Sequence, residues 1–278
     1  MAVSDVSATA VPRLRISLVT PSYNQAAYIR RTIDSVLEQT GNFELEYRVL
    51  DGGSTDGTVE ILESYGDRVA WTSARDHGQV DAINKGLRAA TGDVVGWLNS
   101  DDVLLPGALA RVAAAFAANP GVEWVHGRCR IIDEHDAPVR RWVSFYKHYR
   151  ARNHSFSNLL TENYISQMTA FWRRSVHTEI GYLDPQFDLA FDYALFLSLA
   201  DRGAPIYIDE ELACFRWYET SKSGAGFGKQ VDQATAIAAR YGHAGSWTRA
   251  RMQAKKLAIV SIYRAMGFGR AVLLRTRP

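Results

Sequence analysis

The sequence has few cysteines and no long apolar run. Cys129 and Cys214 are the only two in 278 residues and lie far apart, so neither a disulfide framework nor a zinc site is expected. No stretch approaches the roughly 20 apolar residues that a membrane-spanning helix needs. The first residues also lack the order of a signal peptide. We therefore expect a cytoplasmic protein, with a peripheral position at the inner face of the membrane as an open alternative.

Several common nucleotide and hydrolase motifs are also missing. No Gly-x-Gly-x-x-Gly follows the first expected strand, and neither Gly-Lys-Ser nor Gly-Lys-Thr occurs. The Gly-x-Ser-x-Gly elbow of α/β hydrolases is absent as well. The net charge is only +2, which gives no overall field that would favour nucleic acid. We expect no nucleic-acid partner.

The sequence does contain the pattern of an α/β fold. Apolar residues make up 47% of the chain, which is enough for a substantial core. Short apolar runs alternate with segments of helical periodicity, which is typical of a mostly parallel central sheet with helices on both faces. The expected strands are 15–20, 47–50, 69–72, the one ending at 101, 122–130, 206–208 and 212–217. The expected helices are 28–39, 59–65, 80–90, 106–119 and 193–201, followed by a C-terminal helical extension.

One stretch organises this pattern. The apolar run 94–98 reads as a buried strand, and the chain then reaches Asp101 and Asp102. Ligands of open α/β sheets bind at the carboxyl ends of the strands. Adjacent carboxylates suit a hard cation such as Mg²⁺ or Mn²⁺ that also holds phosphates. A solvated turn or a helix cap is the alternative for an Asp-Asp pair alone.

An ordered set of motifs resembles the family-2 inverting glycosyltransferases of the GT-A fold. These motifs are Pro-Ser-Tyr-Asn at 21–24, Asp-Gly-Gly-Ser-Thr-Asp-Gly-Thr at 51–58, Asp-His-Gly-Gln-Val-Asp-Ala-Ile-Asn-Lys-Gly at 76–86 and Asn-Ser-Asp-Asp at 99–102. The resemblance continues through 163–167, 171–174, 181–184 and 191–193. It implies a flexible arm (1–13), a GT-A domain (14–223) and a basic helical extension (224–278). Within the domain, 14–105 would be the nucleotide-binding half and 106–223 the acceptor half.

The resemblance also implies the donor site. Pro21, Tyr23 and Asp51 would hold the nucleotide base, with Tyr23 stacking on the ring and Asp51 accepting from an imide N–H. A loop cap is the alternative for Asp51. Asp81 and Lys85 resemble base and phosphate contacts, although a solvated helix position is equally open for Lys85.

Two neighbouring aspartates would complete that site. Asp101 corresponds to the ribose contact and Asp102 to the ligand of Mn²⁺ or Mg²⁺. Asn99 stands where relatives often have aspartate, and Tyr218 stands where many have histidine. Since tyrosine is a poor ligand for Mg²⁺, a third protein ligand is not expected there.

The remaining implied roles concern the acceptor. Asp192 lines up with the catalytic base, with Asp188 as the runner-up, and an N-cap of the following helix is the alternative for Asp192. Gln167, Trp172, Arg173 and Tyr218 would face the sugar or acceptor. A packed strand is equally open for the residues around Trp172.

The resemblance predicts an inverting, metal-dependent transfer from a nucleoside diphosphate sugar, most simply a UDP-sugar. The acceptor would be a hydroxyl of a glycan or lipid-linked glycan, as in polysaccharide biosynthesis. Two alternatives are a sugar-nucleotide nucleotidyltransferase and a non-catalytic nucleotide-sugar or carbohydrate-binding module. The first should carry a glycine- and lysine-rich loop after the first strand, where 21–24 stands instead.

The end of the chain has its own pattern. No acidic residue follows Asp232, and apolar residues alternate with arginines and lysines. This is typical of a basic amphipathic helix at an anionic membrane surface. The alternative is an ordinary helix packed on the domain with its basic residues in solvent.

Overall fold

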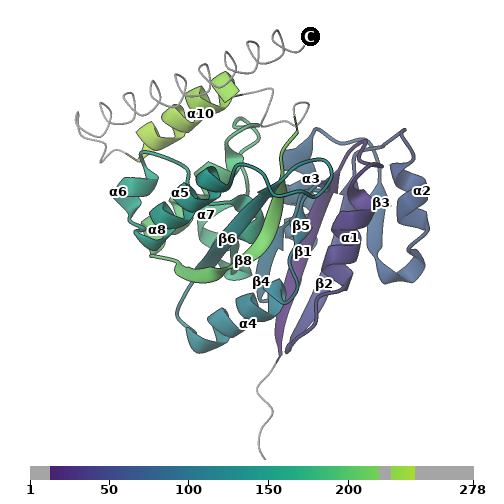
Figure 1. The fold of residues 1–278 in the computed structure, drawn as a ribbon, viewed down its shortest axis with the longest axis horizontal. Coiled ribbons are helices and arrows are strands. Elements are labelled where there is room, and N and C mark those ends of the chain that lie inside the picture. Colours follow the sequence, from purple (N-terminus) through teal and green to yellow (C-terminus); the bar gives the residue numbers. More distant parts are fainter. Residues whose placement is uncertain (1–12, 219–226, 242–278) are drawn as a thin grey trace, which may run out of the picture.

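The computed structural model describes residues 13–218 and 227–241. Its centre is an eight-stranded sheet in the order β3-β2-β1-β4-β7-β6-β8-β5 (Figure 1). The strands are β1 (Leu14–Ser22), β2 (Phe43–Asp51), β3 (Ala70–Ser73), β4 (Val94–Trp97), β5 (Val103–Leu104), β6 (Trp124–Ile132), β7 (Phe171–Arg173) and β8 (Ile206–Arg216). The α/β class predicted from the sequence is confirmed.

The sheet is mixed rather than almost wholly parallel. β1 pairs in parallel with both β2 and β4, and β2 pairs in parallel with β3. β6 and β8 are also parallel. β7 is antiparallel to β4 and β6, and β5 is antiparallel to β8. Both antiparallel strands are too short to show a pattern in the sequence.

Helices cover both faces of this sheet. They are α1 (Ile29–Leu37), α2 (Thr58–Glu63), α3 (Gln79–Ala89), α4 (Ala108–Ala118), α5 (Arg141–Arg152), α6 (Phe156–Leu159), α7 (His177–Ile180), α8 (Phe191–Arg202) and α10 (Phe227–Arg240), with 3₁₀ turns at Gly66–Arg68, Gln167–Thr169 and Arg174–Val176. Ile33 of α1 and Val112 of α4 belong to one core cluster. Ile83 of α3 and Leu197 of α8 belong to another, on the opposite face. The layers are therefore helix, sheet and helix.

Close packing fixes α3 against the middle of the sheet. A Cβ atom at Gly86 would lie 2.4 Å from the Cγ1 of Val19 in β1. Only glycine therefore permits this approach. The contact packs the second half of α3 directly on β1.

Two strand boundaries predicted from the sequence differ from those in the structure. β1 continues through Pro21, which was expected to stop it, because a proline near the end of a strand loses only one ladder hydrogen bond. The two short strands expected at 206–208 and 212–217 form one strand, β8, with register shifts opposite Arg128. The acidic sequence in the middle of β8 is typical of a loop. In the structure, however, Asp209 pairs with Arg152 and Glu211 pairs with Arg130.

Within the described ranges, no helix is both long enough and apolar enough to cross a membrane. The amphipathic tail predicted beyond α10 lies outside the described residues, as does the arm 1–12.

Candidate active site

Three loops meet at one edge of the sheet because their strands are parallel neighbours. Asp51 at the end of β2 is opposite Ser22 at the end of β1. The N–H of Gly52 donates to the carbonyl of Ser22 over 2.9 Å. On the other side of β1, the N–H of Leu98 donates to the carbonyl of Val19 over 2.9 Å. The segments after β1, β2 and β4 therefore lie side by side, as the sequence predicted.

The carboxylate of Asp51 organises the loop that follows it. Its Oδ2 accepts the backbone N–H groups of Gly53 and Ser54 at 3.0 and 2.9 Å and the hydroxyl of Ser73 at 2.7 Å. Its Oδ1 accepts the Ser54 hydroxyl at 2.5 Å. Asp51 therefore does cap the loop that follows it, which was the alternative role considered from the sequence. Because a carboxylate oxygen has two lone pairs, Oδ1 keeps room for a further donor.

The loop after β1 is fastened to the same segment. Asn24 has a left-handed backbone with φ of +51°. Its N–H donates to Ser54 Oγ at 2.8 Å, and its Oδ1 accepts the N–H of Thr55 at 2.9 Å. Next to it, the Tyr23 side chain is 61% exposed, whereas Pro21 is buried in β1. Tyr23 therefore offers a ring to solvent, while Pro21 shapes the backbone.

Asp81 and Lys85 form an ion pair one turn apart on α3. The Nζ of Lys85 lies 2.8 Å from Oδ2 of Asp81, which also accepts the N–H of His77 at 3.1 Å. The hydrogen bond from Lys85 lowers the pKa of Asp81. Both side chains keep exposed surface. They border the site, but their contact with a nucleotide remains a prediction.

Asp101 and Asp102 are neighbours in sequence but differ in environment. Asp102 is fully buried and receives the backbone N–H of Arg216 at 2.9 Å on Oδ1 and the amide of Asn99 at 3.1 Å on Oδ2. Asp101 keeps some exposed surface and accepts the Tyr218 hydroxyl at 2.9 Å. Burial raises the pKa of both carboxyls, and the charge of Asp101 raises that of Asp102 further. Asp101 is therefore the one of the two that a ligand can reach.

Asn99 connects several parts of this edge. Its Oδ1 accepts the amide of Gln79, the first residue of α3, at 2.8 Å. Its Nδ2 donates to Asp102 at 3.1 Å and lies 3.5 Å from Oε1 of Gln167. An aspartate here could not donate, and its charge would stand against that of Asp102. The departure from the common family residue thus matches the buried carboxylate beside it.

Arg216 begins the segment 216–223 that resembles the one closing over the diphosphate in the family, and in the structure it holds the two aspartates in place. Its side chain is 2% exposed and its Nε donates to the carbonyl of Asp101 at 2.9 Å, while Nη1 donates to that of Asp133 at 2.8 Å. The guanidinium also lies over the ring of Tyr28, 4.8 Å from its centroid. An arginine directly after the apolar run 212–215 was the available signal for a buried charge.

Asp192 lies in the half of the domain, 106–223, that was predicted to bind the acceptor. It is the second residue of α8, whose N-cap is Ala190, so the N-cap alternative does not hold. Its Oδ1 accepts the N–H of Tyr193 at 2.8 Å, and Oδ2 lies 3.3 Å from the amide of Asn163. Removal from water raises the pKa of Asp192, whereas the charge of Lys147 on α5 lowers it. Asn163 and Lys147 are further residues near Asp192 to which the sequence gave no such role.

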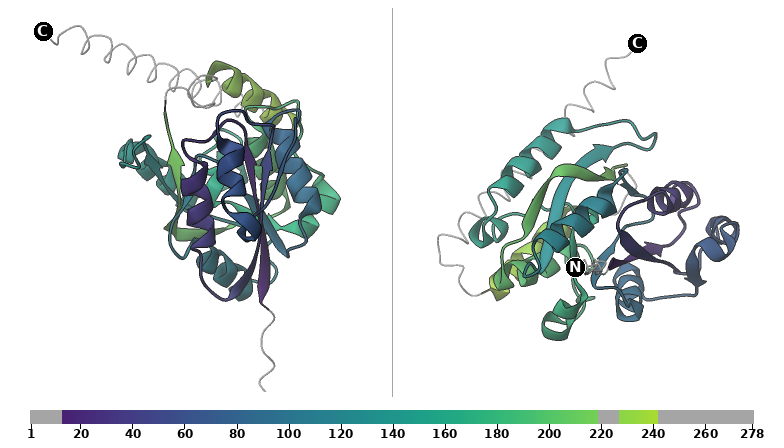
Figure 2. Two further views of the ribbon diagram at one scale, coloured as in Figure 1. Left: turned by 90° about the vertical axis from the view of Figure 1, so that its right-hand side faces the viewer. Right: turned by 90° about the horizontal axis from the view of Figure 1, so that it is seen from below.

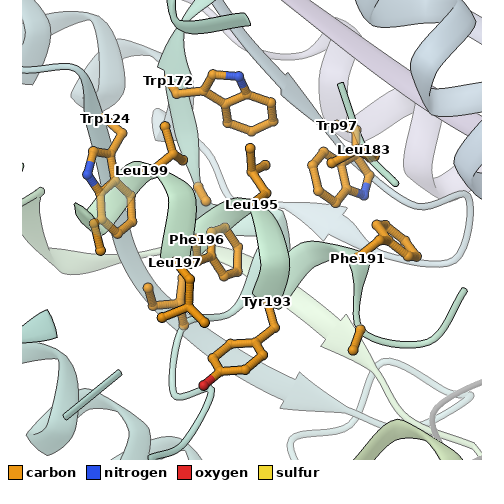
Figure 3. Packing of buried hydrophobic residues seen from close by; sticks show 14 of the residues in the cluster. Trp97, Trp124, Trp172, Leu183, Phe191, Tyr193, Leu195, Phe196, Leu197 and Leu199 are labelled. Carbon is orange, nitrogen blue, oxygen red and sulfur yellow. The ribbon is translucent and has the colours of Figure 1, made fainter. Parts of the chain in front are cut away.

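Aromatic packing places Asp192 near the carboxyl end of β4. Phe191 lies 5.8 Å, between ring centroids, from Trp97, the last residue of β4 (Figure 3). By contrast, the runner-up Asp188 accepts hydrogen bonds from Lys229 and Gln233 of α10. Asp192 is therefore the better placed of the two carboxylates.

The predicted sugar and acceptor contacts divide into two groups. Gln167 stays at this edge, where its amide donates to the carbonyl of Trp97 at 2.7 Å. Trp172 is fully buried against Trp97, and its indole N–H donates to His177. Arg173 pairs with Val94 at the opposite end of β4. The structure does not support a sugar contact for Trp172 or Arg173, because both serve packing instead.

Among residues 13–218 and 227–241, no group of three or more His, Cys, Asp and Glu side chains is arranged to hold a metal ion. From the part of the chain that the structure describes, a divalent cation at this edge would therefore have at most two carboxylates, those of Asp101 and Asp102. This is compatible with Mg²⁺ or Mn²⁺, which commonly bind one or two carboxylates together with substrate phosphates and water.

Solved structures share this fold. The S. aureus TarS fragment 1–349 in complex with UDP-GlcNAc has a TM-score of 0.61 and 19% identity, covering 81% of this chain and 65% of that one. The mannosyltransferase PcManGT from Pyrobaculum calidifontis, in complex with GDP-Man and Mn²⁺, has a TM-score of 0.58 and 21% identity. It covers 95% of this chain and 81% of that one. The fold is therefore of the GT-A type, as predicted.

The sequence comparisons identify the family. A chondroitin synthase of Pasteurella multocida is 29% identical over 191 residues, which are 68% of this chain and 19% of that protein. Another of the first curated relatives, an uncharacterized glycosyltransferase of Nostoc sp., is matched over 40% of its length. The chain thus spans less than half of either relative. The family model described as Glycosyl transferase family 2 matches residues 17–180, more than half of the chain. The chain belongs to glycosyl transferase family 2.

Proposed function

We propose that this chain transfers a sugar from a nucleoside diphosphate sugar, with inversion at the anomeric carbon, to a hydroxyl of a glycan or lipid-linked glycan. One observation carries the proposal. The loops after β1, β2 and β4 converge at one edge of the sheet, with the partly exposed Asp101 there, and Asp192 follows Phe191, whose ring packs near that of the last residue of β4. This arrangement provides a donor site next to a carboxylate for the acceptor.

The donor base would bind between Tyr23 and Asp51. Tyr23 presents an exposed ring for stacking, and the Oδ1 of Asp51 can accept an imide N–H. Both uracil and guanine offer such an N–H. UDP-sugars are our first choice because a structural neighbour was solved with UDP-GlcNAc, and GDP-mannose is the comparison because another was solved with it. Lys85 would contribute charge at the rim of the same site.

A divalent cation, Mn²⁺ or Mg²⁺, fits the end of β4. The residues there are oxygen donors, and Asp101 has both a carboxylate and exposed surface. We assign the direct contact to Asp101 rather than to Asp102, the residue predicted from the sequence, because Asp102 is fully buried whereas Asp101 keeps exposed surface. A bound cation would supply positive charge that stabilises the departing diphosphate.

Tyr218 would position Asp101 without binding the cation itself. Burial and the neighbouring charge of Asp101 raise the pKa of the Tyr218 phenol, so it stays protonated. A protonated phenol donates its hydrogen to Oδ2 of Asp101 and leaves the other oxygen for the ligand. Tyr218 would therefore affect cation binding only through Asp101.

The transfer itself requires one base. The acceptor oxygen attacks the anomeric carbon as the bond to the diphosphate oxygen breaks, and the acceptor proton passes to Asp192. A single displacement needs one such carboxylate, unlike the paired carboxylates of glycosidases. The amide of Asn163 and the charge of Lys147 help to hold Asp192 ionised.

Membership of family 2 argues against the nucleotidyltransferase alternative. A non-catalytic module would bind the same donor without transfer. Polysaccharide acceptors are supported by the relative described as a chondroitin synthase. Peripheral membrane contact through residues 245–278 stays a proposal, because those residues lie outside the described part of the chain.

A donor panel tests the function. The chain is incubated with UDP- and GDP-sugars, with Mn²⁺, Mg²⁺ or EDTA, and release of the nucleoside diphosphate is measured with and without glycan acceptors. We expect one donor to turn over only with a divalent cation, and NMR of the product to show the inverted anomer. Tight donor binding without turnover on any acceptor would instead support the non-catalytic module. A retained anomer would refute the single displacement.

A further inference from the structure

Helix α5 exposes an unusual set of side chains. The residues Trp142, Phe145, Tyr146 and Tyr149 are 56%, 74%, 41% and 59% exposed. Their spacing of three, four and seven residues places them on one face of the helix. In this helix only Ala151 is buried. Figure 2 shows the teal α5 at the outer side of the molecule in both views. An apolar face of this kind usually marks an interaction site.

The charge of α5 is entirely of one sign. Arg141, Lys147, Arg150 and Arg152 lie within the helix, Arg140 precedes it, and the helix has no acidic residue. Exposed aromatic rings beside basic residues on one helix are typical of segments that lie in the headgroup region of an anionic bilayer. The composition thus indicates both an apolar and an anionic component in the partner.

A basic groove lies beneath this helix. It has a volume of about 410 Å³ and lies between α5 and β6, lined among others by Arg128, Arg130, Arg141, Ser144, Phe145 and His148. None of the residues predicted to hold the nucleotide lines it. The groove is therefore separate from the donor site.

Two polar groups in this groove lack partners. The Nε of Arg128 and the hydroxyl of Ser144 are buried and have no hydrogen-bond partner among the described residues. Nη1 of Arg128 lies 3.9 Å from the carboxylate of Asp209, which is also paired with Arg152. Leaving buried polar groups unsatisfied is costly. A phosphate in the groove would pair with the exposed part of the Arg128 guanidinium, whose side chain is 36% exposed. Phe145, 74% exposed at the wall of the groove, would lie beside the apolar part of the same ligand.

We propose that α5 is a membrane-docking helix, with the groove beneath it holding the phosphate of an anionic phospholipid and the exposed rings lying among the headgroups. A neutral glycan could stack on the rings, but it would not use the arginines of the groove, which outnumber its one acidic residue, Glu211. Binding to lipid does not require sugar transfer. Its consequence for the reaction does rest on the proposed function, because Lys147 of the same helix interacts electrostatically with Asp192. Docking would thus bring Asp192 towards a lipid-linked acceptor.

Vesicle flotation of the full chain tests this proposal. We expect binding to phosphatidylcholine vesicles that contain phosphatidylglycerol, weak binding to phosphatidylcholine alone, and a decrease with added salt. The double substitution Trp142→Ser with Phe145→Ser should lower the affinity at least about tenfold, since each removes a buried-ring contribution to the interface. Arg128→Gln with Arg141→Gln should remove the preference for phosphatidylglycerol.

Matched controls separate docking from other effects. Tyr182→Ser removes an exposed ring and Arg68→Gln removes an exposed charge. Neither residue belongs to α5 or lines the groove, so both variants should bind as the unsubstituted chain does. All variants keep residues 245–278, so any contribution of that tail is constant. Asp192→Asn should bind vesicles normally even if it is inactive, which separates this proposal from the proposed function.

Three outcomes would overturn the proposal. They are absence of vesicle binding by the unsubstituted chain, unchanged binding of the α5 variants, and equal binding to vesicles with and without phosphatidylglycerol. Unchanged unfolding temperatures of the variants are the check that a loss of binding does not come from misfolding.

Discussion

The backbone N–H of Arg216 donates to Oδ1 of Asp102 over 2.9 Å and so joins the end of β8 to the loop after β4. The guanidinium of the same residue then reaches the carbonyls of Asp101 and Asp133 and the carboxylate of Asp136. One buried residue thus supports the acidic pair from behind. The stability of the fold and the geometry of the proposed cation site depend on the same contacts.

Replacing Arg216 should therefore be costly. Arg216→Met would leave two partly buried carbonyls without this donor and Asp136 without its buried partner, so we expect a loss of about 2–4 kcal/mol in the free energy of unfolding. Urea denaturation measures it. Arg31→Met is the matched control, since Arg31 also pairs with Asp136 but its side chain is 53% exposed. That change should cost less than about 1 kcal/mol. Equal losses would contradict the role of Arg216.

The two aspartates should respond differently to amide substitution. Asp101→Asn removes the charge that a cation can reach, so we expect Mn²⁺-dependent UDP binding to weaken at least about tenfold, or about 1.4 kcal/mol. Asp102→Asn keeps an oxygen for the N–H of Arg216 and should weaken that binding only a few-fold. Calorimetric titration of UDP with Mn²⁺ or with EDTA compares them. A larger loss of binding in Asp102→Asn than in Asp101→Asn would show that Asp102 is the cation ligand.

The sequence predicted the first half of the fold well for a physical reason. β1 and β4 are largely buried strands with clear apolar runs, β2 has partly exposed polar residues among its buried ones, and parallel pairing brings their ends to one edge. β5 and β7 have two and three residues, so no periodicity could reveal them. Their positions depend on the strands that they pair with. The predicted sheet was consequently more parallel than the observed one.

The site residues were likewise predictable only in part from the sequence. Asp51 ends β2, Asp101 follows β4 and Asp192 lies in the first turn of α8, so their places could be predicted from the expected elements. Trp172 beside Arg173 has the composition of a binding surface, and only tertiary packing shows that the indole is buried against Trp97. Burial also distinguishes Asp101 from Asp102, which a sequence motif cannot do.

The pH dependence of transfer should reflect the environment of Asp192. Removal from water raises the pKa of its carboxyl, and the base must be ionised to act. Activity should therefore fall on acidification at a higher pH than an exposed aspartate would give. The profile of kcat/KM against pH measures this acidic limb.

Substitutions of Lys147 test whether this acidic limb reports the pKa of Asp192. Its charge lowers the pKa of Asp192, so Lys147→Met should move the acidic limb to higher pH, whereas Lys147→Arg should leave it near its original position. A purely structural effect would lower the rate at every pH without moving the limb. An unmoved limb in Lys147→Met would show that Lys147 does not act on the base.

The sharpest test of the base compares two nearby aspartates. Asp192→Asn keeps the shape of the side chain but cannot take a proton, so kcat should fall by about 10²–10⁴ while donor affinity stays the same. Asp188→Asn is the matched control, because Asp188 is held by Lys229 and Gln233 of α10 and should not contact the acceptor. Steady-state kinetics and UDP-sugar titration give both quantities. Full activity in Asp192→Asn together with a large loss in Asp188→Asn would transfer the role of base to Asp188. If donor binding were lost with activity in Asp192→Asn, the residue would belong to the donor site rather than to proton transfer.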